Sequence, residues 1–232
     1  MSIAENIAAI REKIDAAARE SGRTGADITL VGASKMNDAS ACREAIAAGI
    51  DVLGENRVQE MTAKLAENAY DGAPLHFIGH LQRNKVKQVV GKVAIIESVG
   101  SLELLQEIEK QAAKLELVQD ILLEVNIGDE ESKSGFTPEE TMDIAAHMCE
   151  YPHCHLTGLM AIPPISVEPG GNSKYFAQMR QLLVDIKAKK YDNVDMVCLS
   201  MGMSDDFTDA IAEGSTMIRV GTAIFGARNY NK

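Results

Sequence analysis

The chain has 232 residues, 46% of them hydrophobic and 25% charged, and a net charge of −11, which suits a globular protein with one substantial core. A surface this acidic repels nucleic acid and anionic lipid, and the sequence contains no apolar run of membrane-spanning length and no signal-peptide pattern, so we expect a cytoplasmic protein without nucleic-acid or membrane partners. Four cysteines without regular spacing indicate reduced thiols.

An amphipathic helix opens the chain. Isoleucines recur at helical spacing from Ile3 to Ile14, Ser2 and Glu5 form a capping box, and the pattern ends near Gly22. Strands and helices then alternate, about 29 residues per unit. The predicted strands are residues 28–34, 52–53, 75–78, 93–97, 121–126, 156–161, 194–198 and 216–220. The predicted helices between them are residues 38–48, 57–70, 84–90, 102–115, 137–148, 173–189 and 205–213.

Regular alternation of this kind predicts an α/β protein with a parallel sheet. Its number of units fits a single closed (β/α)8 TIM barrel with the opening helix as an extra element. A doubly wound open sheet is the alternative, but Lys35 stands where a dinucleotide-binding glycine would follow the first strand. No linker-like change in composition divides the chain, so we expect residues 1–232 to form one domain. No exposed apolar helix face indicates a dimer surface, so we expect a monomer.

Two glycine-bearing loops follow the last two predicted strands. Ser204 is placed to cap the helix between these strands, and Gly221 with Thr222 follows the final strand. Backbone N–H groups in such loops bind anions, and barrels commonly bind phosphate after strands seven and eight. Two ordinary tight turns are the alternative interpretation, but the hydroxyls beside the glycines favour a phosphate-bearing ligand.

Lys35 and Arg219 narrow the choice of ligand further. Lys35 shares strand parity with Val31 and Ala33, so it points into the barrel mouth if Ala33 faces the interior. Burial lowers the pKa of a lysine and favours attack on a carbonyl to form a Schiff base, although a solvated lysine is the simpler interpretation. A ligand with both a carbonyl and a phosphate is pyridoxal 5′-phosphate. Arg219 can face its ring nitrogen, or it can pair with a carboxylate instead.

Long segments of the sequence resemble the YggS/PROSC family of pyridoxal phosphate homeostasis proteins. They are VGASKMNDASACREAIAAGIDVLGENRVQE, HFIGHLQRNKVK, EVNIGDEESKSGF, GLMAIP and LSMGMSDDFTDAIAEGSTMIRVGTAIFGAR. The resemblance covers residues 28–230 and implies a barrel similar to the N-terminal domain of bacterial alanine racemase, with the cofactor bound as a Schiff base and no established turnover. One departure is His80, where some relatives carry proline.

The resemblance also assigns roles to individual residues. It implies a Schiff base on Lys35, with Arg219 facing the ring nitrogen and Asn56 beside the ring. The residues that it implies for the phosphate are Ser200, Met203, Ser204, Gly221 and Thr222. We expect the partners to be pyridoxal phosphate and related B6 vitamers, with pyridoxal-phosphate-dependent apo-enzymes as further candidates. Lys133 can meet an anionic ligand or lie in solvent, and we favour solvent.

Three functions compete. A carrier or regulator acting in intracellular pyridoxal phosphate homeostasis is the first and preferred one. An amino-acid racemase is the second, but the chain ends directly after the barrel and shows no second base opposite Lys35. A barrel enzyme that acts on a phosphorylated metabolite without a cofactor is the third. His147, Cys149, His153, Cys154 and His155 invite a metal site, but they lie at the opposite end of the barrel without paired ligand spacing, so we expect no metal.

Overall fold

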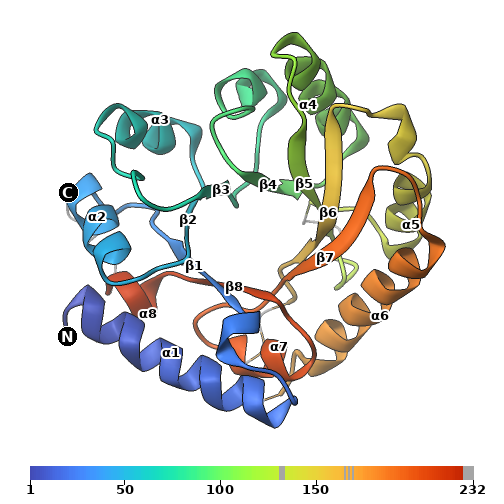
Figure 1. The fold of residues 1–232 in the computed structure, drawn as a ribbon. Coiled ribbons are helices and arrows are strands. Elements are labelled where there is room, and N and C mark those ends of the chain that lie inside the picture. Colours follow the sequence, from blue (N-terminus) through green and yellow to red (C-terminus); the bar gives the residue numbers. More distant parts are fainter. Residues whose placement is uncertain (131–133, 165, 167, 169, 227–232) are drawn as a thin grey trace.

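The computed structural model of the chain describes residues 1–130, 134–164, 166, 168 and 170–226. Its parallel strands close into a barrel in the order β1 to β8, and β8 pairs back with β1 (Figure 1). The strands are β1 (Thr29–Ala33), β2 (Val52–Glu55), β3 (Leu75–Phe77), β4 (Ile95–Val99), β5 (Gln119–Val125), β6 (Cys154–Ala161), β7 (Val194–Ser200) and β8 (Met217–Val220). The predicted (β/α)8 barrel is therefore confirmed.

Helices surround this ring of strands on the outside (Figure 1). The α-helices are α1 (Ile3–Glu20), α2 (Ala39–Ala47), α3 (Val58–Ala66), α4 (Leu102–Lys114), α5 (Pro138–Ala146), α6 (Ser173–Lys189), α7 (Phe207–Ala212) and α8 (Thr222–Phe225). Three short 3-10 helices accompany them, η1 (Gly25–Asp27), η2 (Arg83–Gln88) and η3 (Met148–Glu150). Within the described residues, none of these helices has the length and apolar character needed to cross a membrane.

The extra N-terminal helix forms as the sequence predicts. Ser2 accepts a hydrogen bond from the backbone of Glu5, whose carboxylate accepts one from the Ser2 backbone in return, so the capping box is complete. Ile7, Ile10 and Ile14 are buried. They pack α1 against the outer side of the barrel, where it contacts α2, α7 and α8 (Figure 1).

Residues 84–90 were predicted as a helix, and the structure has the 3-10 helix η2 there, in which Lys85 N donates to Gln82 O and Val89 N donates to Val86 O. Another local prediction was wrong. Ser204 was predicted to cap the helix after β7. A turn at residues 204–206 delays the start of α7 to Phe207, and Asp206, the residue before it, accepts instead from Met203 N at 2.7 Å.

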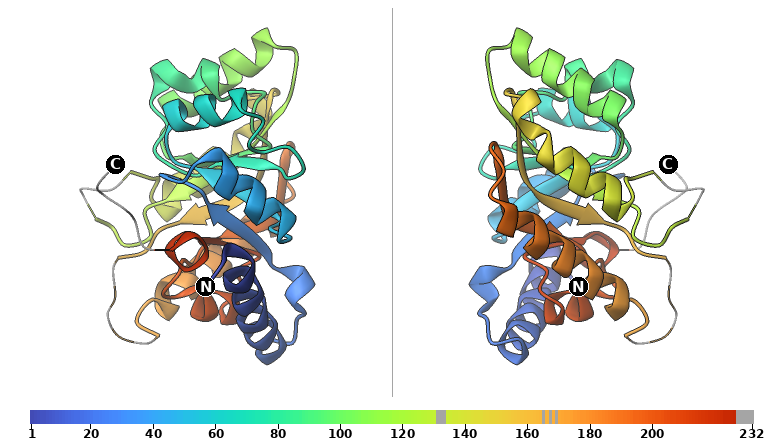
Figure 2. Two further views of the ribbon diagram at one scale, coloured as in Figure 1. Left: turned by 90° about the vertical axis from the view of Figure 1, so that its left-hand side faces the viewer. Right: turned by 90° about the vertical axis from the view of Figure 1, so that its right-hand side faces the viewer.

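Two apolar layers hold the barrel together, as expected where helices cover a closed sheet. The larger lies between strands and helices. The smaller fills the barrel interior and consists of Val31, Ala33, Val52, Ile78, Leu122, Met160, Cys198 and Met217. Val31 and Ala33 thus face inward, which is the condition set above for Lys35. The loops after β5 and β6 project from one end of the barrel, where the strands have their C-terminal ends (Figure 2).

Candidate functional site

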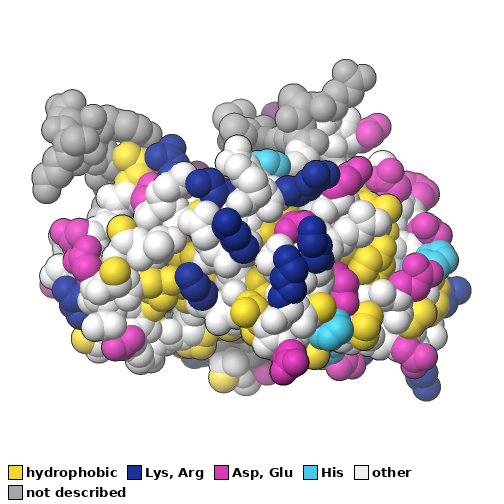
Figure 3. All heavy atoms as spheres, turned by 90° about the horizontal axis from the view of Figure 1, so that it is seen from above, with side chains coloured by type: hydrophobic (Ala, Val, Ile, Leu, Met, Phe, Trp, Pro, Cys, Tyr) yellow, Lys and Arg dark blue, Asp and Glu magenta, His cyan; other side chains and the backbone are white. Residues whose placement is uncertain are grey.

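A pocket of about 570 Å³ opens at the C-terminal ends of strands β2 to β6. Its lining residues are Asn56, Ile78, Gly79, His80, Ser98, Glu124, Val125, Asn126, Ser134 and Ile162. A neighbouring pocket of about 550 Å³ shares Asn56 and His80 and adds Arg57 and Lys85. Figure 3 looks at the side of the molecule that carries α3, η2 and α4, and shows lysine and arginine side chains gathered on this otherwise acidic protein. Such a local concentration of positive charge attracts anions.

Lys35 lies in a tight turn directly after β1. Ser34 before it is fully buried, Lys35 itself is half-buried, and Met36 after it has a φ of 63° in the left-handed region. Asn37 N donates to Ser34 O at 3.1 Å and closes the turn. Lys35 thus follows directly after a strand whose Val31 and Ala33 face inward. That its side chain points into the barrel mouth stays a prediction.

The loops after β7 and β8 lie next to each other on the same rim. Thr222 Oγ1 is 3.4 Å from Ser204 Oγ, so the two predicted phosphate-binding hydroxyls come together from positions 18 residues apart. Buried Ser215 joins the end of β7 to the start of β8, because its hydroxyl is within 3.2 Å of the carbonyl oxygens of Leu199, Met201 and Met217. Met203 is 39% exposed beside this rim.

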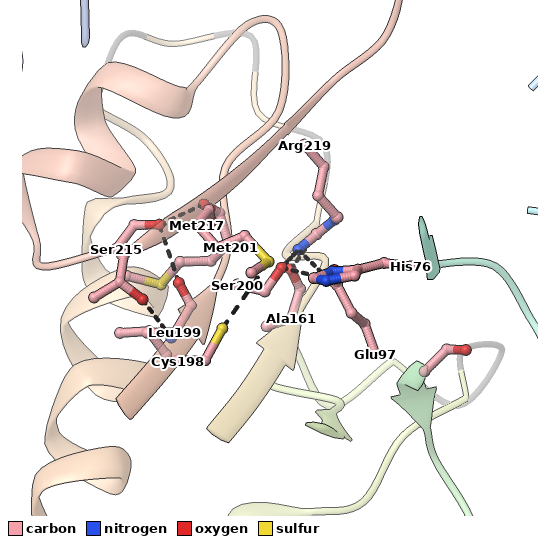
Figure 4. Close-up of polar contacts among 12 residues, drawn as sticks. His76, Glu97, Ala161, Cys198, Leu199, Ser200, Met201, Ser215, Met217 and Arg219 are labelled. Atoms are coloured by element: carbon pink, nitrogen blue, oxygen red, sulfur yellow. Dashed lines mark hydrogen bonds and ion pairs between the residues drawn. The ribbon is translucent and has the colours of Figure 1, made fainter. Parts of the chain in front are cut away.

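Ser200 and Arg219 lie deeper, inside the barrel (Figure 4). Arg219 Nη1 donates to Ser200 Oγ at 2.5 Å and Arg219 Nη2 donates to Ala161 O at 2.9 Å. Ser200 Oγ donates in turn to Glu97 Oε2 at 2.6 Å. The hydroxyl of Ser200 is therefore engaged by protein groups in this structure, whereas the sequence placed it with the phosphate-binding residues.

Glu97 joins Arg219 to a histidine on the opposite wall. Glu97 Oε1 is 2.7 Å from His76 Nδ1, and Glu97 Oε2 is 4.0 Å from Arg219 Nη1 (Figure 4). Burial alone raises the pKa of Glu97, but the hydrogen bond and charge of His76, with Arg219 and Ser200, bring the pKa below its ordinary value. Burial lowers the pKa of Arg219 and Glu97 opposes that shift, and a guanidinium stays protonated in either case. The interior thus holds a buried carboxylate beside a buried guanidinium of opposite charge.

Comparison with known proteins places the chain in a family. Residues 3–229 match the alanine racemase N-terminal domain family. A pyridoxal phosphate homeostasis protein of Aquifex aeolicus is 41% identical over 99% of this chain and 100% of its own length. The homeostasis protein of Escherichia coli K12 is 42% identical over 99% of this chain and 98% of its own length. The chain belongs to the family of pyridoxal phosphate homeostasis proteins.

A solved structure of this fold is PipY of Synechococcus elongatus PCC7942, which is described with PLP bound. It superposes with a TM-score of 0.83 at 32% identity, and the match covers 97% of this chain and 100% of PipY. PipY is thus similar to this chain along almost its whole length.

Three polar residues at or below the mouth escaped the sequence analysis. His76 and Glu97 belong to the interior network, and Glu124 lines the pocket, where Ser134 Oγ lies 3.3 Å from its carboxylate. Burial raises the pKa of Glu124 above its ordinary value, although Ser134, Arg219 and His80 act in the other direction. A signal was available for Glu97, because a carboxylate within the apolar strand IIESV needs a buried partner.

Asn56 is the predicted residue that lines the pocket directly. It follows β2, and its side-chain oxygen Oδ1 is buried without a hydrogen-bond partner among the described residues. An unpaired buried acceptor is costly, so it fits a ligand that brings a donor to this wall. His80, the departure noted in the sequence, lines the same wall.

The histidines considered for a metal site have carboxylate partners. His153 Nδ1 is 2.7 Å from Glu109 Oε1, and His155 contacts Asp120 and Asp195 at 2.9 and 3.2 Å. Within the described part of the chain, no group of three or more histidine, cysteine or acidic side chains is arranged to hold a metal ion. Lys133 lies outside the described residues.

Proposed function

We propose that this protein holds pyridoxal 5′-phosphate as a Schiff base on Lys35 and acts in intracellular pyridoxal phosphate homeostasis. The observation that carries the proposal is that Lys35 directly follows β1, at the same end of the barrel as the loops in which Ser204 and Thr222 meet. The names of the full-length relatives and the PipY structure with PLP bound support it. We further propose that residues 1–232 act as one cytoplasmic domain.

The chemistry at Lys35 is a condensation. Lys35 would supply the neutral amine and the bound cofactor would supply an aldehyde, and their condensation to a C=N bond would release one water molecule. The residues of the chain supply binding and orientation for this step. A half-buried amine has a smaller hydration shell to lose, which helps it to react as a nucleophile.

We assign the phosphate to the rim formed by the loops after β7 and β8. Ser204 and Thr222 offer hydroxyl donors there, and Gly221 lets the backbone of its loop approach a ligand. Ser200 and Met203 belong to the same loop region. We propose that Ser200 acts from below, through the hydrogen bond that orients Arg219.

We assign the ring to the space between Asn56 and Arg219. The unpaired oxygen of Asn56 is an acceptor for a hydroxyl of the ligand. Arg219 can only donate, so a pyridine nitrogen facing it stays unprotonated and the ring withdraws electrons weakly. This favours a carrier or regulator over an amino-acid racemase, and it is why we propose a protein that holds the cofactor and exchanges it, with pyridoxal-phosphate-dependent apo-enzymes as recipients.

The proposal is tested by titrating the purified protein with pyridoxal phosphate and recording the visible spectrum. The wild type is expected to turn yellow and to retain the cofactor through gel filtration. The Lys35→Ala variant is expected to lose the yellow band, while the control Lys92→Ala, at an exposed lysine, keeps it. A colourless wild type, or a band that survives in Lys35→Ala, contradicts the proposal.

A further inference from the structure

A buried polar cluster lies on the outer side of β1 and β2, next to the turn that carries Lys35. Glu55 at the end of β2 receives three donors on its Oε1 atom. Lys64 Nζ is 2.5 Å away, Ser34 Oγ is 2.6 Å away and Tyr70 OH is 3.0 Å away. Glu55 and Ser34 are fully buried, and Lys64 of α3 is 6% exposed. None of these side chains enters the site described above.

The cluster needs an explanation other than stability. Removing two charges from water costs several kcal/mol per ion, and apolar residues of the same volume often stabilise a core equally well. Burial and the charge of Glu55 also raise the pKa of Tyr70, which therefore remains a neutral donor. The charged groups instead fix the relative positions of the residues that they join, because each donor must meet its acceptor in a defined geometry.

The hydrogen bonds of this cluster hold Ser34, the residue before Lys35. Lys64 Nζ donates to the carbonyl oxygen of Ser34 at 2.8 Å, while the Ser34 hydroxyl donates to Glu55. The backbone N–H of Ser34 donates to Gly54 O at 3.0 Å. Ser34 is therefore held through its side chain, its carbonyl and its amide.

The same helix also holds the residue after Lys35. Glu60 Oε2 accepts a hydrogen bond from Met36 N at 2.8 Å. Glu60 and Lys64 are four residues apart on α3, so they lie on one face of that helix. One face of α3 thus forms hydrogen bonds with the backbone on both sides of Lys35.

We propose that Glu60 and Lys64 of α3 are positioning residues that fix the backbone of Lys35 for Schiff-base formation. The inference rests on the proposed function of Lys35. A reacting group displaced by about 1 Å can lose about a hundredfold in rate, so two contacts that hold the turn matter to an amine that must reach one carbon atom.

Glu60 offers the first test, because it is partly exposed and its replacement leaves the core intact. Glu60→Ala removes the acceptor of Met36 N, whereas Glu60→Gln keeps an amide oxygen at the same place. In the protein without cofactor, hydrogen exchange at the Met36 amide is expected to accelerate in Glu60→Ala and to stay near the wild-type rate in Glu60→Gln. Retention of pyridoxal phosphate is expected to fall about tenfold in Glu60→Ala alone, the loss expected for one hydrogen bond to a charged group. Glu67→Ala, at an exposed glutamate that ends the same helix, is the charge-matched control.

Lys64 offers the second test. Lys64→Met keeps the length of the side chain without a donor, and Glu55→Gln in the same variant avoids an unpaired buried charge. This double variant is expected to retain the cofactor about tenfold less well. Tyr70→Phe removes another donor to Glu55 without touching the turn, and it is expected to retain the cofactor like the wild type.

The outcomes separate this inference from the proposed function. Equal behaviour of Glu60→Ala and Glu60→Gln in both measurements, or an equal loss in Tyr70→Phe and the Lys64 double variant, overturns the positioning role. A wild type that forms no borohydride-reducible bond with pyridoxal phosphate overturns the proposed function instead. The Met36 exchange rates are read without cofactor and still report whether α3 holds the turn.

Discussion

Glu97 and Arg219 face each other across the barrel interior, with 4.0 Å between Glu97 Oε2 and Arg219 Nη1. The Ser200 hydroxyl bridges them, accepting from the guanidinium at 2.5 Å and donating to the carboxylate at 2.6 Å. The direction of Arg219 is therefore set by protein groups, because a fully buried carboxylate and the Ala161 carbonyl oxygen hold it. Preorganisation of this kind lowers the cost of binding.

The first prediction concerns acid stability. The pKa of Glu97 lies below its ordinary value of 4.5 in the folded chain, so its charge stabilises the fold above pH 4.5, and that contribution is lost as pH falls through the folded pKa. Replacing Glu97 with Gln breaks a buried charge pair, and we expect a loss of about 3–5 kcal/mol in the free energy of unfolding at pH 7. Denaturant unfolding at several pH values is the measurement. The gap between wild type and variant is expected to narrow below pH 4.5, and a gap that does not depend on pH contradicts the role of Glu97.

The second prediction concerns Glu124, whose pKa is shifted in the opposite direction to that of Glu97. Burial holds the pKa of Glu124 above its ordinary value of 4.5, so its ionisation costs the folded state stability as pH rises past that value. Glu124→Gln removes the charge and keeps an oxygen for the Ser134 hydroxyl. We expect a higher Tm than wild type at pH 7 and a smaller difference at pH 4. A variant that is less stable at pH 7 counts against this explanation.

The third prediction concerns the phosphate. Thr222→Ala or Ser204→Ala is expected to weaken cofactor retention by ~1.5–3 kcal/mol, the value of one hydrogen bond to a charged group. Thr208→Ala, at an exposed threonine of α7, is the matched control and is expected to change nothing. Equilibrium dialysis with pyridoxal phosphate and with pyridoxal measures both affinities. Equal affinity for the two ligands refutes a phosphate site at these loops.

The fourth prediction is that racemase turnover is absent or marginal. Removing the α-proton of an amino acid needs a strongly electron-withdrawing ring and a placed base. In the proposed arrangement Arg219 faces the ring nitrogen and leaves it unprotonated. Each missing acid–base group costs about 10²–10⁴ in rate. Incubation of the loaded protein with L- and D-alanine in deuterated water, followed by chiral analysis, is expected to show at most slow exchange on one face. Rapid interconversion of L- and D-alanine that is lost in Lys35→Ala contradicts this prediction and identifies the protein as an enzyme.

Much of the fold can be predicted from the sequence because its signals are local. Isoleucine spacing and the Ser2–Glu5 capping box define α1, and the parity of β1 places Val31 and Ala33 inside the barrel. The predicted start of α7 was wrong because Asp206, two residues after Ser204, accepts the hydrogen bond from Met203 N at that turn. Propensity does not decide between two nearby side chains of this kind.

The network inside the barrel is harder to predict, because its members come from distant strands. His76 and Glu97 are 21 residues apart, and Ser200 is 103 residues from Glu97. Strand parity indicates that such residues face inward, but the register between strands decides which of them meet. The contact between Lys64 and the Ser34 carbonyl depends in the same way on where α3 packs.

The central claim is that Lys35 carries the cofactor, and borohydride reduction followed by peptide mapping tests it most directly. Reduction of the pyridoxal phosphate complex is expected to fix one pyridoxyl group on the peptide that contains Lys35. Lys64, whose amine is engaged by Glu55 and Ser34, is expected to stay unlabelled. A label on a different lysine, or no label after saturation with cofactor, contradicts the claim.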